Sequence, residues 1–397
     1  MTRANVWMSH RQLLVHQAIA KIGGYWPPLA AVARLLEEIG EFVEILEEPK
    51  MDIAAAASEL ADVWIISTCI ANQFTVPIDV EFVRDAESDL DIGTALGQVI
   101  QLSGRLAKVV NYYGGPKKPK NPDELLSLGV IVTRLHEALG NIANVLSIDL
   151  EDSISNSLAL SIERDQRRFD PSFDPSTAPC LTTFQELADS TPCTFARAAK
   201  VWGSSTWDPT RSIRHNVEIL APYLTRFCRV APKEHPDGFV VLPRWGPDTL
   251  TSLAHRFCSL LHALCVVDPI PNNCLNDKLD RPGWQFIFSG QRLFVSVFSP
   301  IYPINHVRHS RHAMILFQPE ESFSVHGIGK AFSESDDIKI LIRRRFADAG
   351  YIYPSGEIDA RHEARIYLLP ILTGSEPVKW WQRDWQPSRA PLTEHMP

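Results

Sequence analysis

The sequence lacks the features of a membrane or secreted protein. No run of eighteen apolar residues occurs among its 397 residues, although a membrane-spanning helix needs about that length. Residues Met1–Leu14 do not show the pattern of a signal peptide. The seven cysteines are odd in number, have no regular spacing and form no C-x-x-C pair, which argues against a disulfide framework and favours reduced thiols. We therefore expect a soluble, cytoplasmic protein that does not bind a membrane.

An excess of basic residues is also absent. Lysine and arginine total 39, against 47 aspartate and glutamate residues, and the formal charge is −8 with a pI near 5.9. This balance provides no extended basic surface for a phosphate backbone, so nucleic acid is not an expected partner.

Length and composition divide the chain into two domains. A chain of 397 residues exceeds a typical single core, and a hydrophobic content of 45% supplies enough apolar surface for two. The stretch Phe169–Pro179 is rich in proline and cannot sustain a helix. Helical composition precedes it, whereas helices and strand-like runs alternate after it. We predict an all-α helical bundle over residues 1–165, a linker over 166–180, and an α+β domain with an antiparallel sheet over 181–397.

Two acidic motifs lie in the predicted helical domain. Glu37-Glu38-Ile39-Gly40-Glu41 comes first, and Glu59-Leu60-Ala61-Asp62 follows within the strongly apolar segment Asp52–Phe74. Glu38 and Glu41 are three residues apart, as are Glu59 and Asp62, so each pair shares one face of a helix. A carboxylate within an apolar helix is costly unless it is paired, protonated or bound to a metal.

These four acids, Glu38, Glu41, Glu59 and Asp62, predict a metal site. Two antiparallel helices can direct four carboxylates into one cavity, where oxygen ligands suit Mg²⁺ or Mn²⁺. A charged and solvated helix face is the alternative explanation of the first motif. The apolar surroundings of Asp62 favour the metal site.

The order and separation of the two motifs resemble those of the MazG-like, all-α nucleoside triphosphate pyrophosphohydrolases, directly over about residues 26–83. The resemblance implies that the four acids hold Mg²⁺ and that a nucleoside triphosphate is hydrolysed to monophosphate and pyrophosphate. Glu41, with Glu38 beside it, would orient or deprotonate the attacking water. The resemblance also implies assembly through the bundle into a homo-oligomer.

The same region contains a faded internal repeat. Leu36–Leu46 resembles Ile100–Val110, and Ile70–Asn72 resembles Ile142–Asn144. The second copy lacks the acids, since Arg105 stands in place of Glu41 and Arg134 near the place of Asp62. We interpret residues 1–165 as a fused pseudo-dimer with one metal-bearing half. The candidate contacts to the phosphates or the base, each with a surface or packing role as its alternative, are Trp26, Arg105, Lys108 and Asn111.

Periodicity in the C-terminal domain predicts helices and strands in mixed order. The predicted helices are Pro192–Trp202, His215–Arg226, Pro247–Val266 and Ser335–Phe346. The predicted strands are Gly238–Leu242, Trp284–Phe288, Leu293–Phe298, Ala313–Phe317 and Ile366–Leu369.

Two groups of residues in this domain can carry chemistry. Cys193 precedes a predicted helix, whose N-terminal amides can activate a thiol. Asn305–His312 contains three histidines and two arginines, namely His306, His309, His312, Arg308 and Arg311. Imidazole suits iron, zinc or haem, and arginine suits carboxylates. A surface or hydrogen-bonded role is the alternative for each histidine.

Residues 184–369 resemble the YqcI/YcgG family. The shared features are the Pro192-Cys193 segment, the aromatic hairpin Trp284–Phe294, the basic histidine-containing stretch and the Arg343-x-Arg345 helix, whereas Ala364 stands where family members usually have tryptophan. The resemblance implies a haem-dependent N-hydroxylase of a guanidino amino acid, which uses O₂ and an electron donor. His306 or His312 would be the axial ligand, and Arg308 and Arg311 would contact the haem.

Two alternatives remain open. In the first alternative, the N-terminal domain is a nucleotide sensor without hydrolytic activity. In the second, the C-terminal domain is a non-haem domain that acts through Cys193.

Overall fold

The computed structural model describes residues 7–78, 91–116, 118–121, 124–164, 173–246, 249–327, 337–354, 361–382 and 385–386. The chain divides into two compact units. The N-terminal unit comprises Met1–Thr177 with Pro232–Glu234, and the C-terminal unit comprises Ala178–Ala231 with His235–Pro397. Parts of the predicted linker (166–172) and of two predicted helices (247–248 and 335–336) lie outside the described residues.

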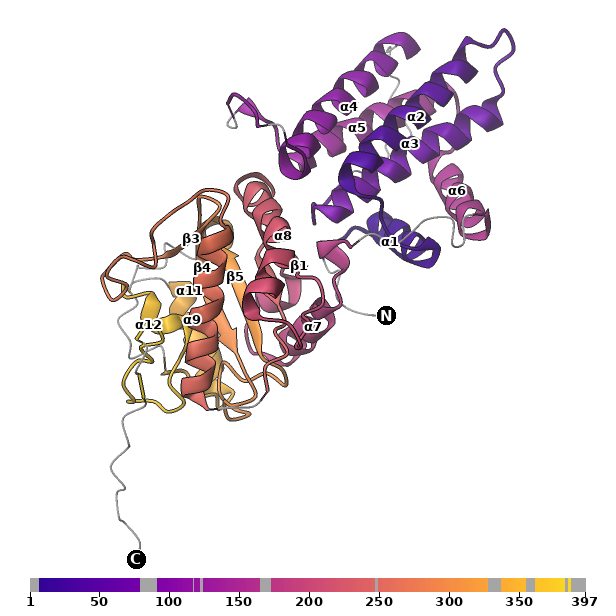
Figure 1. Cartoon of the computed structure of the whole chain (residues 1–397). Coiled ribbons are helices and arrows are strands. Elements are labelled where there is room, and N and C mark those ends of the chain that lie inside the picture. The colour runs from indigo at the N-terminus through magenta and orange to yellow at the C-terminus, as the bar shows by residue number, and fades with distance from the viewer. Residues whose placement is uncertain are drawn as a thin grey trace, which may run out of the picture. The chain divides into compact units, whose positions relative to one another are not determined.

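The N-terminal unit is helical in its described parts (Figure 1). Its helices are α1 (His10–Ile22), α2 (Pro28–Glu47), α3 (Ile53–Gln73), α4 (Ile92–Gly114), α5 (Leu128–Val145) and α6 (Leu150–Arg164). α2 packs along α3, and α4 packs along α5, so the bundle consists of two helical hairpins that contact each other through α2 with α4 and α3 with α5. α1 and α6 pack against α3.

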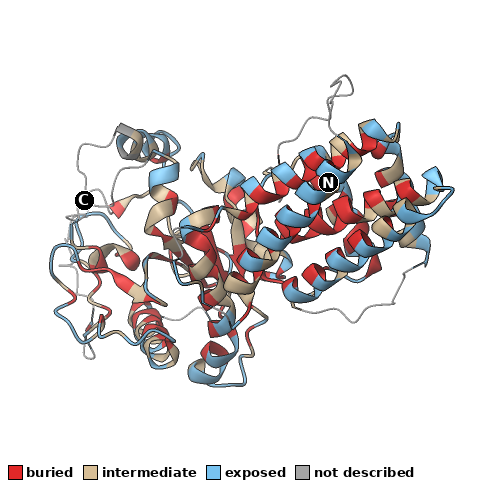
Figure 2. Ribbon diagram, turned by 90° about the horizontal axis from the view of Figure 1, so that it is seen from above, coloured by how far each residue is buried: buried red, intermediate tan, exposed pale blue. Residues whose placement is uncertain are grey.

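α3 is the central helix of this bundle. Asp52 caps its first turn by accepting hydrogen bonds from the backbone N–H groups of Ala54 and Ala55. From Val63 to Gln73 every residue is buried, which confirms the prediction of a helix surrounded by apolar neighbours. Figure 2 shows the same pattern more widely, with buried residues on the inner sides of the helices and exposed residues outside.

The two hairpins share a burial pattern. α2 begins at Pro28 and α4 at Ile92, and the same shift in sequence number relates the buried positions of the two helices. In α2 these are Ala31, Leu35, Glu38, Ile39 and Phe42, and in α4 they are Ala95, Val99, Leu102, Ser103 and Leu106. Leu102 therefore occupies in α4 the position that Glu38 occupies in α2.

α3 and α5 also end in the same way. Thr75 and Ser147, which follow them, both have a φ of 56°. The next N–H donates back into the helix in each case, from Val76 to Ala71 O at 3.0 Å and from Ile148 to Ala143 O at 2.8 Å. This closure satisfies carbonyl groups at the helix end. Left-handed backbone at two non-glycine residues is uncommon, so its recurrence is a specific likeness between the hairpins.

The C-terminal unit contains a five-stranded mixed sheet. Its strands are β1 (Val201–Gly203), β2 (Gly238–Val241), β3 (Phe286–Phe288), β4 (Gln291–Phe298) and β5 (Met314–Pro319), in the order β1-β2-β5-β4-β3. β1 and β2 are parallel and the other pairs are antiparallel. Ser289 and Gly290 turn the β3–β4 hairpin with positive φ at both residues, as a tight two-residue turn requires.

Helices and short helical turns accompany this sheet (Figure 1). They are α7 (Cys180–Ser190), α8 (Ile213–Glu234), α9 (Leu250–Val267), α10 (Glu320–Val325), α11 (Asp337–Asp348) and α12 (Ala364–Tyr367), with the 3₁₀ turn η4 at Ala196–Ala198. α3 and α9 are each long and apolar enough to cross a membrane by composition, but their buried faces are also compatible with a soluble protein.

Two predicted elements are wrong. Pro192–Trp202 is not a helix, because it contains η4 and then enters β1, whose pairing with β2 fixes its extended form. Ile366–Leu369 is not a strand, because Ala364–Tyr367 forms α12. The hydroxyl of Tyr367 donates to Leu293 O and accepts from Phe286 N–H, so tertiary hydrogen bonds hold this turn against the β3–β4 hairpin.

Candidate functional sites

The first candidate site is an acidic cluster of three residues from α2 and α3. One carboxylate oxygen from each of Glu38, Glu41 and Glu59 lies within 4.8 Å of the others. Oxygen ligands around a common Mg²⁺ are separated by about 3–4 Å, since each lies about 2.1 Å from the ion. Small side-chain adjustments would therefore bring the three oxygens to coordination distance.

Glu38 is the buried member of the acidic cluster, with 2% of its surface exposed. Burial raises the pKa of Glu38 to about 8, and the charges of Asp62 and Glu41 and a hydrogen bond with Glu59 act in the same direction. Burial also raises the pKa of Glu59. Among the described residues no hydrogen-bond donor reaches Oε2 of Glu38 or Oε2 of Glu59. A proton or a cation can satisfy these oxygens.

Asp62 lies beside the acidic cluster and has a partner of its own. Its Oδ1 accepts a hydrogen bond from the hydroxyl of Ser157 on α6. Burial raises the pKa of Asp62, although the Ser157 bond opposes that shift. The structure thus brings three of the four predicted ligands together. The fourth is close enough to act on their charge, and its role as a ligand stays a prediction.

Arg34 is a member of the site that the sequence motifs did not reveal. Its guanidinium pairs with Glu37 at 2.6 Å and with Glu38. It lowers the pKa of Glu38 but does not overcome the effect of burial. Its i, i+4 spacing from Glu38 was the available signal.

The predicted phosphate and base contacts stay predictions. Arg105 and Lys108 on α4 are exposed, and Asn111 is half-buried. The carbonyl oxygen of Trp26 accepts a hydrogen bond from Gln73 at 2.6 Å. Gln73 lies fourteen residues beyond Glu59 on α3, which places the Trp26 backbone about 21 Å along that helix from the acids.

In the C-terminal unit, His306 is a buried structural residue. Its Nδ1 accepts from the N–H of Arg308 at 3.0 Å, and its Nε2–H donates to Pro370 O at 3.1 Å. The ring stacks on Tyr302 at 4.4 Å, and burial lowers the pKa of His306 to about 4. Axial coordination by His306 stays a prediction, but it would cost one of these two hydrogen bonds.

The other four residues of the basic stretch differ in exposure and in contacts. His309 donates from Nδ1 to Tyr302 O at 2.7 Å, whereas Arg311 and His312 are exposed. Arg308 is half-buried, and its guanidinium lies 5.1 Å from the centre of the Phe298 ring. Of the five residues, Arg308 is the one among the described lining residues of the cavity in this unit.

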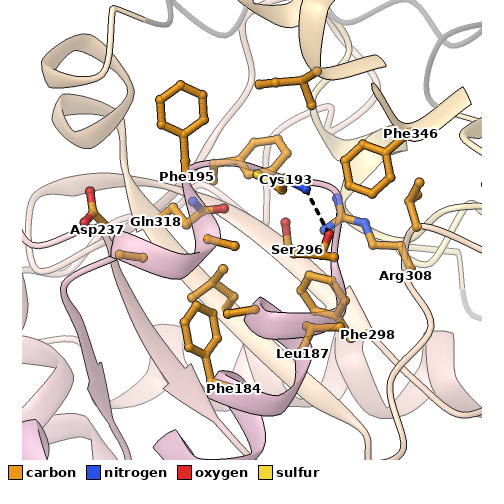
Figure 3. A pocket seen from close by; sticks show the side chains of 18 of the residues that line it. Phe184, Leu187, Cys193, Phe195, Asp237, Ser296, Phe298, Arg308, Gln318 and Phe346 are labelled. Carbon is orange, nitrogen blue, oxygen red and sulfur yellow. Dashed lines mark hydrogen bonds between the residues drawn. The ribbon is translucent and has the colours of Figure 1, made fainter. Parts of the chain in front are cut away.

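That cavity is the second candidate site, with a volume of about 320 Å³ (Figure 3). Strand alternation turns Phe294, Ser296 and Phe298 of β4 to one face, and the register places Gln318 and Leu316 of β5 beside them. α7, α10, α11 and α12 also contribute side chains to its lining.

Besides the carboxylate of Asp237, two potential metal ligands or catalytic groups line the cavity. One is Cys193, which no α-helix follows, so the predicted activation by a helix N-terminus has no structural basis. The other is His326, whose Nε2 lies 2.6 Å from Oδ1 of Asp237 and whose ring contacts Phe195. His326 and Asp237 are distant in sequence and follow no motif, which is why sequence reasoning missed this pair.

Comparison with known proteins supports one of the two predicted family resemblances, that of the C-terminal unit. Residues 182–367 match the model of the YqcI/YcgG family, in agreement with the resemblance that the sequence motifs indicated. The chain has no match among curated proteins or solved structures. These comparisons give no support to the MazG-like resemblance of the N-terminal unit, which stays a prediction.

Proposed function

We propose that the N-terminal unit is a Mg²⁺-dependent pyrophosphohydrolase, which converts a nucleoside triphosphate to monophosphate and pyrophosphate. The acidic cluster carries the proposal, because Glu38 is an almost fully buried carboxyl that faces other acids. A buried carboxyl with like charges around it is destabilising unless it is paired, protonated or metal-bound, and the ion pair of Glu38 with Arg34 does not overcome the effect of burial.

The residues fit Mg²⁺ or Mn²⁺ in kind and in number. Glu38, Glu41 and Glu59 supply hard oxygen ligands, and a divalent cation would replace the proton that Glu38 and Glu59 otherwise share. When bound, the ion would neutralise charge on the triphosphate. Arg34 offers a guanidinium at the edge of the same cluster.

The chain's own residues have separable roles in this proposal. Glu38 and Glu59 act as ligands, whereas Glu41, which is exposed, is both a ligand and the group that orients or deprotonates water. The water oxygen bonds to the α-phosphorus, the bond between that phosphorus and the bridging oxygen breaks, and pyrophosphate leaves. Positioning and charge neutralisation supply most of the catalysis in such reactions.

The likeness between the two hairpins supports a single site per chain. By the shifts that align α2 with α4 and α3 with α5, the counterparts of the four acids are Leu102, Arg105, Ile131 and Arg134. Trp64 and His136 are counterparts under the same shift and stack on each other at 4.6 Å. We infer a duplicated, pseudo-two-fold bundle in which only the first hairpin binds metal.

A panel of nucleoside triphosphates with Mg²⁺ tests the proposal. We expect pyrophosphate and monophosphate as products, with ¹⁸O from labelled water in the monophosphate. Glu38→Gln and Glu59→Gln should each lower turnover at least 100-fold, whereas Glu44→Gln, an exposed acid on the same helix, should have no effect. Unchanged turnover in Glu38→Gln would disprove it. Metal-dependent nucleotide binding without products would favour the sensor.

For the C-terminal unit we infer that any haem would bind through another donor set than the predicted histidines. His306 uses both ring nitrogens, and His312 lies outside the cavity. Cys193 and His326 line an aromatic cavity, and Arg308 and Arg343 there can pair with carboxylates. Bound haem would supply oxygen activation, while these residues hold and orient it.

Reconstitution with haemin tests this second proposal. We expect the absorption spectrum of the bound form to change in Cys193→Ser or His326→Ala and to remain unchanged in His312→Ala. A spectrum that responds only to His312→Ala would restore the prediction from sequence. Absence of haemin binding would remove the haem hypothesis for this unit.

A further inference from the structure

The cavity of the C-terminal unit combines an apolar body with positive charge. Aromatic rings reach it from four helices and strands, as Phe184, Phe294, Phe298, Phe323 and Phe346. Its volume of about 320 Å³ is at the lower end of the range for small-molecule sites, roughly 300–1,000 Å³. A compact ligand with an apolar body suits this space.

The positive charge comes from Arg308 and Arg343. Neither forms an ion pair with a carboxylate in the described part of the chain, although Arg308 donates a long hydrogen bond of 3.4 Å to Ile366 O. Burial lowers the pKa of Arg308 from its ordinary value. An anion in the cavity would offset the cost of burying this guanidinium.

The negative charge of the cavity wall is already paired. Asp237 is the carboxylate among the lining residues. Its Oδ1 accepts from Nε2 of His326 at 2.6 Å, and its Oδ2 accepts from the N–H of Lys200 at 2.7 Å. A guanidinium ligand needs a carboxylate partner when it is desolvated, and the described part of the wall offers no uncommitted carboxylate.

We propose that this cavity binds a small organic acid, with its carboxylate on Arg308 and Arg343 and its apolar or aromatic body among the phenylalanine rings. This ligand class goes beyond the proposed hydrolase function and differs from the guanidino amino acid that the family resemblance implies. The proposal depends on neither haem nor the acidic cluster.

Figure 3 shows how the charged and aromatic side chains are arranged around the cavity. Arg308 and Asp237 are on opposite sides of the cavity, with Cys193, Ser296 and Gln318 between them. Phe346 and Phe298 flank the guanidinium of Arg308, so a carboxylate bound there directs the rest of the ligand toward the aromatic walls. His326 then lies on the far wall, held by Asp237.

Calorimetric titration of the full-length protein, purified without added haem, tests the proposal. The acids are indole-3-acetate and 4-phenylbutyrate. Indole-3-acetamide is the matched neutral compound, agmatine and guanidinium are the cations, and haemin is a separate arm. We expect the acids to bind, the amide to bind at least tenfold more weakly, and the cations not to bind.

Variants assign the binding to the two arginines. Arg343→Met and Arg308→Met should each weaken binding of the acids at least tenfold, and Arg344→Met, an exposed neighbour on α11, should not change it. If Arg308→Met unfolds, Arg343→Met alone decides the question. Three outcomes would overturn the proposal. The cations bind more tightly than the acids, binding of the acids is unchanged in both arginine variants, or haemin is the one compound that binds. Pyrophosphate release by Arg343→Met should equal that of the unmodified protein, which separates this test from the hydrolase.

Discussion

Metal binding at the acidic cluster should release a proton, and its pH dependence can be worked out from Glu38. Burial among acids raises the pKa of Glu38 to about 8, so at pH 7 Glu38 holds about 0.9 of a proton that a cation must displace. The apparent affinity should therefore rise about fifty-fold between pH 6 and pH 8 and then level off, which corresponds to about 2 kcal/mol.

Titration calorimetry with Mg²⁺ or Mn²⁺ measures this proton directly. The heat of binding at pH 7 is compared in two buffers of different ionisation enthalpy, and the difference gives the number of protons released. We expect about one proton for the unmodified protein and for Glu44→Gln, and none for Glu38→Gln, in which metal binding itself is weakened. Equal heats in both buffers, or an affinity constant from pH 6 to pH 8, would refute the reasoning.

The same residue sets a stability trend in the absence of metal. Since the folded-state pKa of Glu38 lies above the value for an exposed glutamate, the folded unit binds the proton more tightly than the unfolded chain. The free energy of unfolding should therefore fall as the pH rises from about 4.5 to 8. Glu38→Gln should flatten this fall, and saturating Mg²⁺ should reverse it in the unmodified protein.

Three further predictions concern stability. Gly203→Ala should lower the melting temperature, because the added Cβ would meet the side chains of Cys180 and Ala178. Its control is Gly104→Ala, at an exposed helix position where a Cβ has no atom within 4 Å, which should stabilise the protein by about 1 kcal/mol. Glu363 is fully buried and forms hydrogen bonds with Tyr367 and Gln285, and burial raises its pKa to about 7. Glu363→Gln should therefore reduce the loss of stability between pH 4.5 and 7 in urea titrations. Leu102→Glu places a carboxyl at a buried position, and a carboxyl is more fully ionised at pH 8 than at pH 5. The variant should therefore lower the melting temperature more at pH 8, and equal shifts at the two pH values would contradict this.

Local periodicity was sufficient for most of the helices and for the acidic cluster. Glu38 and Glu41 share a helix face by their spacing, and the apolar run around Glu59 predicted the buried helix that brings it beside them. The hydrogen bond between Asp62 and Ser157 joins residues almost a hundred positions apart. No local pattern predicts such a partner, so the sequence could not show that Asp62 differs from the other three.

The C-terminal unit shows the limits of local reasoning more clearly. A histidine-rich stretch drew attention to His306, but a histidine flanked by apolar strands is equally typical of a buried structural residue, and its two ring nitrogens proved to be engaged. The pair that does line the cavity, His326 and Asp237, meets only because Asp237 directly precedes β2 and His326 follows β5, the strand paired with it. The pairing of β2 with β5 brings these two residues together, and local sequence patterns do not predict that pairing.

The internal likeness within the bundle bears on why Glu38 is there at all. Leu102 occupies the counterpart position in α4 and is buried among apolar neighbours, so this helix packing accepts an apolar side chain. A glutamate there costs free energy through desolvation and the charges of Asp62 and Glu41. Because the fold does not require that cost, the acid needs another cause. A cation that binds Glu38, Glu41 and Glu59 together supplies one, and it also accounts for the absence of these acids from the second hairpin, where two exposed arginines stand instead.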